Sequence, residues 1–400
     1  MFLGLPWPVF ALSLSTGLGM SVAVMSVAVT PSAGLQMAPT PRLASVPYGL
    51  QFFATMLAAY PLTVLFGLFG RKPVVVMSLA LGILAGITGY VAVRENNFLY
   101  LCAAMCAFGI FAATLSSFRF AAAELVSGHN LARALALTNF GGTFAALLGP
   151  TLVISAPSVL GLDFRESAYL AMVFVVIAMG ILIIMTPFGS KRAELSLSKN
   201  DRPQGEDGNG ILFAGTLFLF VTFCGATGYG IMSGVMIATG LEMEQVGIAD
   251  VPRTQLIQYH VLAMYGPSLF TGSILQRLGQ RNFLSLGIFL LAMSPITGLF
   301  APAYWAFAIS LIFLGFGWNF LYVGGSAIIA ARFTGQDKLR SQGLFDTATS
   351  MFSAITSISA AMILSVLSWN GLMYAGLAMI AIMVALALLT NFGKRGSPWL

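Results

Sequence analysis

The chain has 400 residues, of which 58% are hydrophobic and only 8% carry a charged side chain. A typical soluble domain is about 45–50% apolar and about 25% charged. With 13 acidic and 19 basic side chains, this chain cannot cover the surface of a water-soluble protein of its length, so lipid is expected to solvate most of it.

Twelve apolar segments follow one another along the chain, each long enough to cross a bilayer as an α-helix. The predicted spans are residues 8–30, 45–68, 73–93, 98–122, 133–155, 167–188, 211–238, 253–275, 282–300, 304–331, 339–365 and 371–392. Segments of this length favour helices over the shorter, alternating strands of a membrane barrel. The first is expected to be a retained helix, because no Lys or Arg precedes it. The sequence therefore predicts an all-α integral membrane protein with twelve transmembrane helices.

The basic residues are distributed unevenly between alternate loops. If the N-terminus is cytoplasmic, the outer loops hold only Arg42, Arg94, Arg165 and Arg253, and the other basic residues lie on the inner side. Short cytoplasmic loops carry the excess of Lys and Arg in membrane proteins. Both termini are therefore predicted to be cytoplasmic. The net charge of +6 is explained by topology, and no nucleic-acid partner is expected.

The longest polar tract, GSKRAELSLSKNDRPQGEDGNG at 189–210, separates six predicted spans from six. It is interpreted as a cytoplasmic linker between a bundle at 1–188 and a bundle at 211–400. Each half has a glycine and basic stretch between its second and third helices, TVLFGLFGRK at 63–72 and GSILQRLGQR at 272–281. A shift of 209 positions places Gly70 on Gly279. These similarities between the two halves predict two pseudo-symmetric six-helix bundles.

This organisation resembles the major facilitator superfamily, whose loop motif runs Gly-x-Leu-x-Asp-Arg-x-Gly-Arg-Lys/Arg. The second stretch matches the motif at Gly272, Arg277, Gly279 and Arg281, and the first keeps Gly70, Arg71 and Lys72. The usual acidic residue is replaced by Gln276 in one half and by Gly67 in the other. The Arg-x-x-Gln-Gly pattern of drug-exporting members is also absent, with Met105 and Phe108 at its polar positions.

The resemblance implies alternating access, in which two bundles rock about a site near the middle of the bilayer. Residues expected to contribute to the inner gate are Arg71, Lys72, Arg277, Arg281, Arg119, Glu124 and Arg340. For the cations of the loop motif, such as Arg277 and Arg281, the alternative is that they only set the topology. For Arg119, a contact with an anionic substrate and an ion pair with Glu124 both stay open.

Ionisable residues inside a membrane are costly and indicate functional sites. Asp346 is predicted to lie about 9 Å along the eleventh helix, where it would bind a proton or a cation, or would pair with a gate arginine. His260 is a second candidate for coupling, because histidine titrates near neutral pH. Its alternative role is that of a structural, hydrogen-bonded side chain.

Other polar and aromatic residues are candidates for substrate binding. By resemblance, the first, fourth, seventh and tenth helices line the cavity. The candidates are Asn319, Trp318, Tyr322, Tyr229, Gln258, His260 and Gln51. Indole, amide and phenol groups would suit an aromatic or amphipathic solute. The alternative is that the aromatic side chains fill gaps between closely packed, glycine-rich helices.

The leading hypothesis is a monomeric secondary transporter for a small organic solute in a prokaryotic inner membrane, driven by protons or another ion. No nucleotide-binding loop occurs, and neither a cofactor nor a metal ion is expected. Too few histidines and carboxylates are present to favour an enzyme. A multidrug-type efflux antiporter and a transporter-like receptor or scaffold remain as alternatives.

Overall fold

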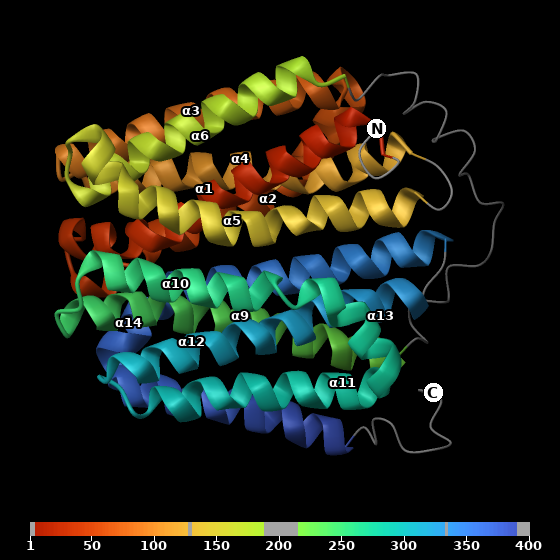
Figure 1. Ribbon diagram of the computed structural model, residues 1–400. Coiled ribbons are helices and arrows are strands. Elements are labelled where there is room, and N and C mark those ends of the chain that lie inside the picture. The colour runs from red at the N-terminus through yellow and green to blue at the C-terminus, as the bar shows by residue number, and fades with distance from the viewer. Residues whose placement is uncertain (1–4, 127–129, 188–214, 333–334, 390–400) are drawn as a thin grey trace. The chain divides into compact units, whose positions relative to one another are not determined.

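The computed structural model describes residues 5–126, 130–187, 215–332 and 335–389, and within these ranges the regular elements are all helices (Figure 1). The elements of the first part are α1 (Trp7–Met37), η2 (Pro41–Leu43), α2 (Val46–Phe69), α3 (Arg71–Arg94), α4 (Phe98–Glu124), α5 (Asn130–Leu160) and α6 (Phe164–Met185). Those that follow are α9 (Gly215–Gln245), α10 (Asp250–Tyr265), α11 (Ser268–Gly298), α12 (Tyr304–Trp318), η3 (Asn319–Val323), α13 (Gly324–Arg332) and α14 (Gly335–Leu389). The predicted linker at 189–210 lies outside the described residues.

Helix α14 contains most of two predicted spans, and α11 contains the end of one predicted span and most of the next. The backbone leaves the helical conformation at Gly279 within α11 and at Ser368 within α14. These positions fall between the predicted spans 253–275 and 282–300, and between 339–365 and 371–392. In the described part of the chain, nine helical stretches are long and apolar enough to cross a membrane, one of which contains both halves of α14. The all-α membrane fold is confirmed, and its helices are consistent with the twelve predicted spans.

The predicted span at 253–275 is interrupted in the structure. Helix α10 ends at Tyr265, a turn occupies Gly266 and Pro267, and α11 begins at Ser268. Proline cannot donate a backbone hydrogen bond, and its ring disfavours a helical conformation for the residue before it. The apolar run continues through this proline, so hydropathy alone did not reveal the break.

The chain divides into two compact units. Unit 1 contains Met1–Arg202 and Gly247–Gln258, and unit 2 contains Pro203–Val246 and Tyr259–Leu400. The beginning of α10 is thus grouped with unit 1. The predicted bundle boundaries at 1–188 and 211–400 stay a prediction.

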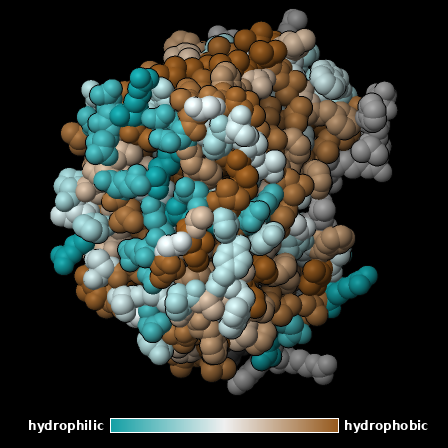
Figure 2. Space-filling model, turned by 60° about the vertical axis from the view of Figure 1, so that its left-hand side comes forward, coloured by the Kyte–Doolittle hydropathy of each residue, from teal (hydrophilic) through white to brown (hydrophobic). Residues whose placement is uncertain are grey.

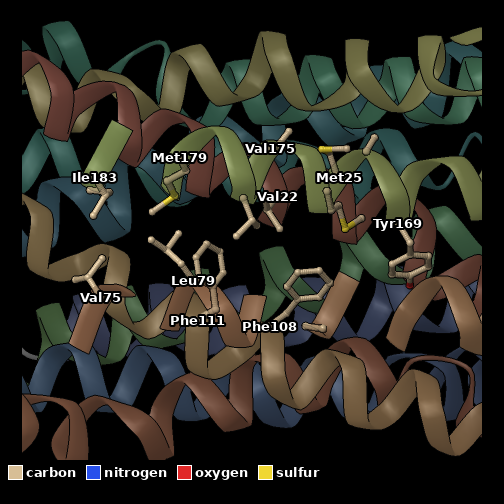
Figure 3. Close-up of a cluster of buried hydrophobic side chains, with 14 of the residues drawn as sticks. Val22, Met25, Val75, Leu79, Phe108, Phe111, Tyr169, Val175, Met179 and Ile183 are labelled. Carbon is tan, nitrogen blue, oxygen red and sulfur yellow. The ribbon is translucent and has the colours of Figure 1, made fainter. Parts of the chain in front are cut away.

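The core of unit 1 is formed by aliphatic, methionine and aromatic side chains (Figure 3). Helix α1 packs mainly against α5, α2 against α4, and α3 against α4 and α6. Phe108 and Phe111 of α4 lie in the same cluster as Leu79 of α3 and Met179 of α6. Glycines permit the close contacts, since a Cβ at Gly86 would lie 2.5 Å from Val173 Cγ2. Small residues serve this purpose at helix contacts in membranes generally.

In unit 2, α9 packs most extensively against α14, and α11 against α12. Between α9 and α14, the hydroxyl groups of Ser233 and Ser353 are buried and 2.6 Å apart. A Cβ at Gly230 would come within 3.4 Å of Phe352. The contact is therefore close and carries a satisfied polar pair.

The outer surfaces of the helices are strongly hydrophobic. On α6, for example, Phe174, Ile181 and Ile184 are each more than half exposed, at 56%, 57% and 62%. Figure 2 shows hydrophobic residues over broad areas of the surface, and hydrophilic residues gathered in limited regions. Large exposed apolar areas are unfavourable in water and favourable in lipid. The surface therefore fits a multi-pass membrane protein.

Candidate functional site

An aromatic cluster lies in unit 2, at the π-helical turn η3. Trp318 stacks on Tyr322, with ring centroids 5.0 Å apart and planes 24° apart. Tyr229 of α9 meets both rings edge-on, at 5.5 Å from Trp318 and 5.0 Å from Tyr322. Tyr265 of α10 contacts Trp318 at 5.6 Å, and Phe345 of α14 stacks on Tyr322 at 5.7 Å. The structure thus brings together three of the predicted residues, Trp318, Tyr322 and Tyr229.

The indole of Trp318 has an unusual property for a buried polar side chain. Only 2% of the residue is exposed, and its Nε1–H has no hydrogen-bond partner among the residues that the structure describes. Buried donors are nearly always satisfied, so a native exception calls for an explanation. A ligand acceptor that reaches this N–H is one such explanation.

Asn319 holds the π-helical turn in place. Its Nδ2 donates to the Met264 carbonyl at 2.6 Å and to Ser268 Oγ at 2.7 Å, and its Oδ1 accepts from Thr271 Oγ1 at 2.7 Å. These partners flank the break at Pro267, where helix ends leave backbone groups without helical partners. The amide bonds favour a structural role for Asn319. Its predicted contact with substrate stays a prediction.

Asp346 of α14 lies close to the aromatic cluster. It is half-buried, and its carboxylate interacts electrostatically with the Tyr229 phenol. It directly follows Phe345, which stacks on Tyr322. The structure therefore places the predicted coupling residue beside the predicted aromatic residues. Its role in coupling stays a prediction.

His260 and Gln258 lie on α10 outside this cluster of rings. His260 is fully buried, and its Nδ1 is 2.7 Å from the Leu311 carbonyl of α12. Its Nε2 has no partner among the described side chains and backbone groups. The contact of Nδ1 with a backbone carbonyl fits the structural alternative for His260. Gln258 is half-buried.

Unit 1 contains a buried network of uncharged polar groups around Gln51, another predicted residue. Ser26 Oγ donates to Gln51 Oε1 at 2.7 Å and lies 3.4 Å from Thr30 Oγ1. Thr30 Oγ1 is 2.9 Å from the Tyr169 phenol oxygen. Met105 Sδ is 3.5 Å from the Ser26 hydroxyl and 3.4 Å from that of Thr30. Sequence reasoning missed Tyr169 and Thr30; a tyrosine amid the aliphatic residues of α6 was the available signal.

Two gate candidates of unit 1, Arg71 and Lys72, are the first residues of α3 and directly follow Gly70 at the end of α2. Gly70 has φ 82° and ψ 161°, and Gly279 in unit 2 has φ 73° and ψ 162°. This conformation is nearly restricted to glycine, so the two loop motifs share a backbone device as well as sequence. Lys72 Nζ donates to the carbonyls of Ile184 and Thr186 at the end of α6, at 2.8 and 2.9 Å.

The remaining gate candidates are exposed or partly exposed, or their side chains lie outside the described residues. Arg277 and Arg281 are exposed, and Arg71 is partly exposed. The side chains of Arg119, Glu124 and Arg340 lie outside the described part of the structure. The gating roles of all these residues stay predictions. No group of three or more His, Cys, Asp or Glu residues suited to a metal ion occurs among the described residues.

Comparisons with known proteins place these features in context. The family model of the Major Facilitator Superfamily matches residues 3–267 and 260–398. The riboflavin transporter RfnT of Brucella anthropi is 28% identical over 381 residues, which cover 94% of each chain.

Two solved structures are similar in fold. The nucleoside transporter NupG has a TM-score of 0.71 at 12% identity, covering 96% of this chain and 99% of NupG. A D-xylose–proton symporter has a TM-score of 0.72 at 12% identity, covering 94% of this chain and 96% of the symporter.

Proposed function

Because the chain belongs to the major facilitator superfamily, we propose that it is a secondary active transporter that moves a small organic solute across the membrane by alternating access. Its relatives support transport rather than catalysis, since RfnT, which matches 94% of this chain, is a riboflavin transporter. The prokaryotic inner membrane and cytoplasmic termini remain part of this proposal, supported by the distribution of basic residues.

The aromatic cluster of unit 2 is the observation that carries the choice of substrate class. Tyr229 and Tyr322 are half-buried and leave ring surface available beside the buried Trp318, and the three ring centroids lie 5.0–5.5 Å apart. Offset and edge-on contacts of this kind are favourable for another aromatic ring. The buried N–H of Trp318 would donate to a polar atom on that ring. The substrate is therefore a planar, largely uncharged aromatic solute of the riboflavin type.

Coupling to protons at Asp346 completes the proposal. This carboxylate interacts electrostatically with the Tyr229 phenol, so protonation of Asp346 changes the electrostatic environment of one ring of the cluster. Carboxylates inside membranes commonly serve as proton relays. Proton uptake and substrate binding would thus share the residues next to η3.

Transport of radiolabelled riboflavin into proteoliposomes containing the full chain tests the proposal. We expect saturable uptake that excess D-xylose does not inhibit. Trp318→Phe keeps a ring but removes the indole N–H, so we expect riboflavin affinity to fall about 3- to 10-fold. Trp305→Phe, at a residue of the same helix that is 53% exposed, is the matched control.

Each outcome separates the alternatives. Folded protein that neither binds nor moves riboflavin would refute the substrate class. Binding without uptake would favour the receptor or scaffold, and uptake of many unrelated cationic drugs would favour the multidrug antiporter. The latter is disfavoured by Met105, which occupies the position of the arginine of drug-exporting members and accepts hydrogen bonds from neutral hydroxyl groups.

A further inference from the structure

A chain of four buried polar side chains crosses unit 1 from α6 to α2. It runs from Tyr169 through Thr30 and Ser26 to Gln51, and we call these four residues the Gln51 relay. Tyr169, Thr30 and Ser26 are 0% exposed and Gln51 is 6% exposed. Polar groups at such depth are costly unless they are hydrogen-bonded, so their arrangement needs a reason.

The chemistry of the four groups sets the direction of donation along the relay. Either oxygen can donate in the 2.9 Å contact between Tyr169 and Thr30, and we assign the donor to the phenol because it is the more acidic hydroxyl. Thr30 can then donate toward Ser26 or Met105, and Ser26 donates to Gln51 Oε1 at 2.7 Å. Every hydroxyl proton is used, and the relay ends on the carbonyl oxygen of the Gln51 amide.

This ending leaves the amide nitrogen of Gln51 as the unused group. The Oε1 atom is occupied by Ser26, and Nε2 has no partner among the described residues. Gln51 is 6% exposed, and its Nε2 is not one of the fully buried atoms without a partner, so this nitrogen remains accessible. A ligand acceptor that reaches it would accept a hydrogen bond from the amide.

The backbone around Gln51 is also held tightly. Thr55 Oγ1 donates to both the Gln51 carbonyl at 2.8 Å and the Gly109 carbonyl at 2.9 Å, which joins α2 to α4. A Cβ at Gly109 would lie only 2.2 Å from the Gln51 carbonyl oxygen. The backbone of Gln51 on α2 is therefore fixed by direct contact with α4, and a rigid backbone positions a side chain accurately.

We propose that Gln51 contacts the substrate as a hydrogen-bond donor to a carbonyl group, and that Tyr169, Thr30 and Ser26 are positioning residues that orient its amide. This inference rests on the proposed function and adds a specificity-determining residue to it. The relay and Met105 carry no charge, so they match a neutral acceptor rather than a carboxylate. The ring system of riboflavin presents such acceptors, because two carbonyl groups flank an N–H on its pyrimidine edge.

Riboflavin binding to the full-length protein in nanodiscs, followed by quenching of flavin fluorescence, tests the inference. Gln51→Leu removes the donor at similar size, and we expect affinity to fall about 10- to 100-fold. Gln36→Leu, at an exposed glutamine on α1, is the matched control and should leave affinity unchanged. Thermal unfolding of each variant checks that it is folded.

The positioning role has its own readout. Tyr169→Phe removes only the phenol oxygen at the start of the relay, and we expect affinity to fall about 3- to 10-fold. If Tyr169 acts through Gln51, this loss should disappear when Tyr169→Phe is combined with Gln51→Leu. Additive losses would show a separate structural effect and overturn the relay.

Substrate analogues test the acceptor. In 2-thioriboflavin and 4-thioriboflavin, sulfur replaces one of the two carbonyl oxygens and is a weaker acceptor. The wild type should bind one of them several-fold more weakly than riboflavin, and Gln51→Leu should not distinguish that analogue from riboflavin. Unchanged affinity of Gln51→Leu for riboflavin would overturn this inference alone. Absence of riboflavin binding to the wild type would overturn the proposed substrate class and this inference with it.

Discussion

Gly109→Ala should destabilise unit 1, because it places a methyl group where α2 and α4 already touch. The new Cβ would lie 2.2 Å from the Gln51 carbonyl oxygen, 2.8 Å from Ala54 Cβ and 3.1 Å from the Gln51 carbonyl carbon. Two of these atoms belong to the backbone, so no side-chain rotation relieves the overlap. The helices must separate by roughly 1 Å, which also disturbs the bonds from Thr55 to both carbonyls.

The magnitude follows from the cost of overpacking a close contact, about 1–3 kcal/mol. For a unit of this size, each kcal/mol lowers the unfolding midpoint by about 2–4 °C, so we expect a decrease of about 2–12 °C. Thermal unfolding of the purified protein, followed by intrinsic fluorescence, measures it. Riboflavin affinity should fall as well, because Gln51 moves with α2.

Gly67→Ala is the matched control, since it makes the same chemical change on α2. Gly67 is exposed, and a Cβ there would meet nothing within 4 Å. Alanine is favoured over glycine in a helix by about 0.5–1 kcal/mol, so the midpoint should stay or rise slightly. Equal midpoints for Gly109→Ala and Gly67→Ala would refute the close contact between α2 and α4.

Three further predictions concern single side chains. Asn319→Ala should lower the free energy of unfolding by about 2–4 kcal/mol in chemical denaturation, because the buried groups near Pro267 lose their hydrogen-bond partner. In the same assay, Asn97→Ala removes the N-cap of α4 and should cost only about 1 kcal/mol. Lys72→Met should cost about 0.3–1 kcal/mol through loss of its bonds to the end of α6, with recovery in Lys72→Arg, and unaltered stability together with lost uptake would instead indicate a gate. Asp346→Asn should abolish the acceleration of riboflavin uptake by a pH gradient while equilibrium exchange persists, and a preserved response to the gradient would remove Asp346 from coupling.

The repeat of the loop motif in the two halves can be recognised in the sequence at two glycines. Gly70 and Gly279 are 209 positions apart, and both adopt nearly the same backbone conformation with positive φ. The sequence carries this information because only glycine adopts that conformation without strain. In the same way, apolar segments about 20 residues long determine helices, since lipid cannot satisfy an exposed backbone. Such local constraints need no knowledge of neighbouring helices.

For the candidate site residues, the sequence predicts the chemistry of each side chain better than its partner. Trp318, Tyr229 and Tyr322 were singled out because indoles and phenols suit an amphipathic solute, and the structure brings them together. Asn319 was singled out for the same chemistry, yet its amide bonds clamp the break beside Pro267. The residue type was informative in both cases. The partner that each group meets depends on which helices adjoin, which one helix at a time does not reveal.

Length, composition and local conformational rules in the sequence alone therefore determined the membrane fold, its spans and its repeated loop motif. Only the tertiary structure decided that Tyr169, 118 positions from Gln51 in the sequence, is connected to its amide through Thr30 and Ser26. Hydrogen bonds across α1, α2 and α6 act over about 3 Å, and the sequence spacing of the residues carries no record of them. The packing of the helices brings these residues together, and with them the donor that we assign to the substrate.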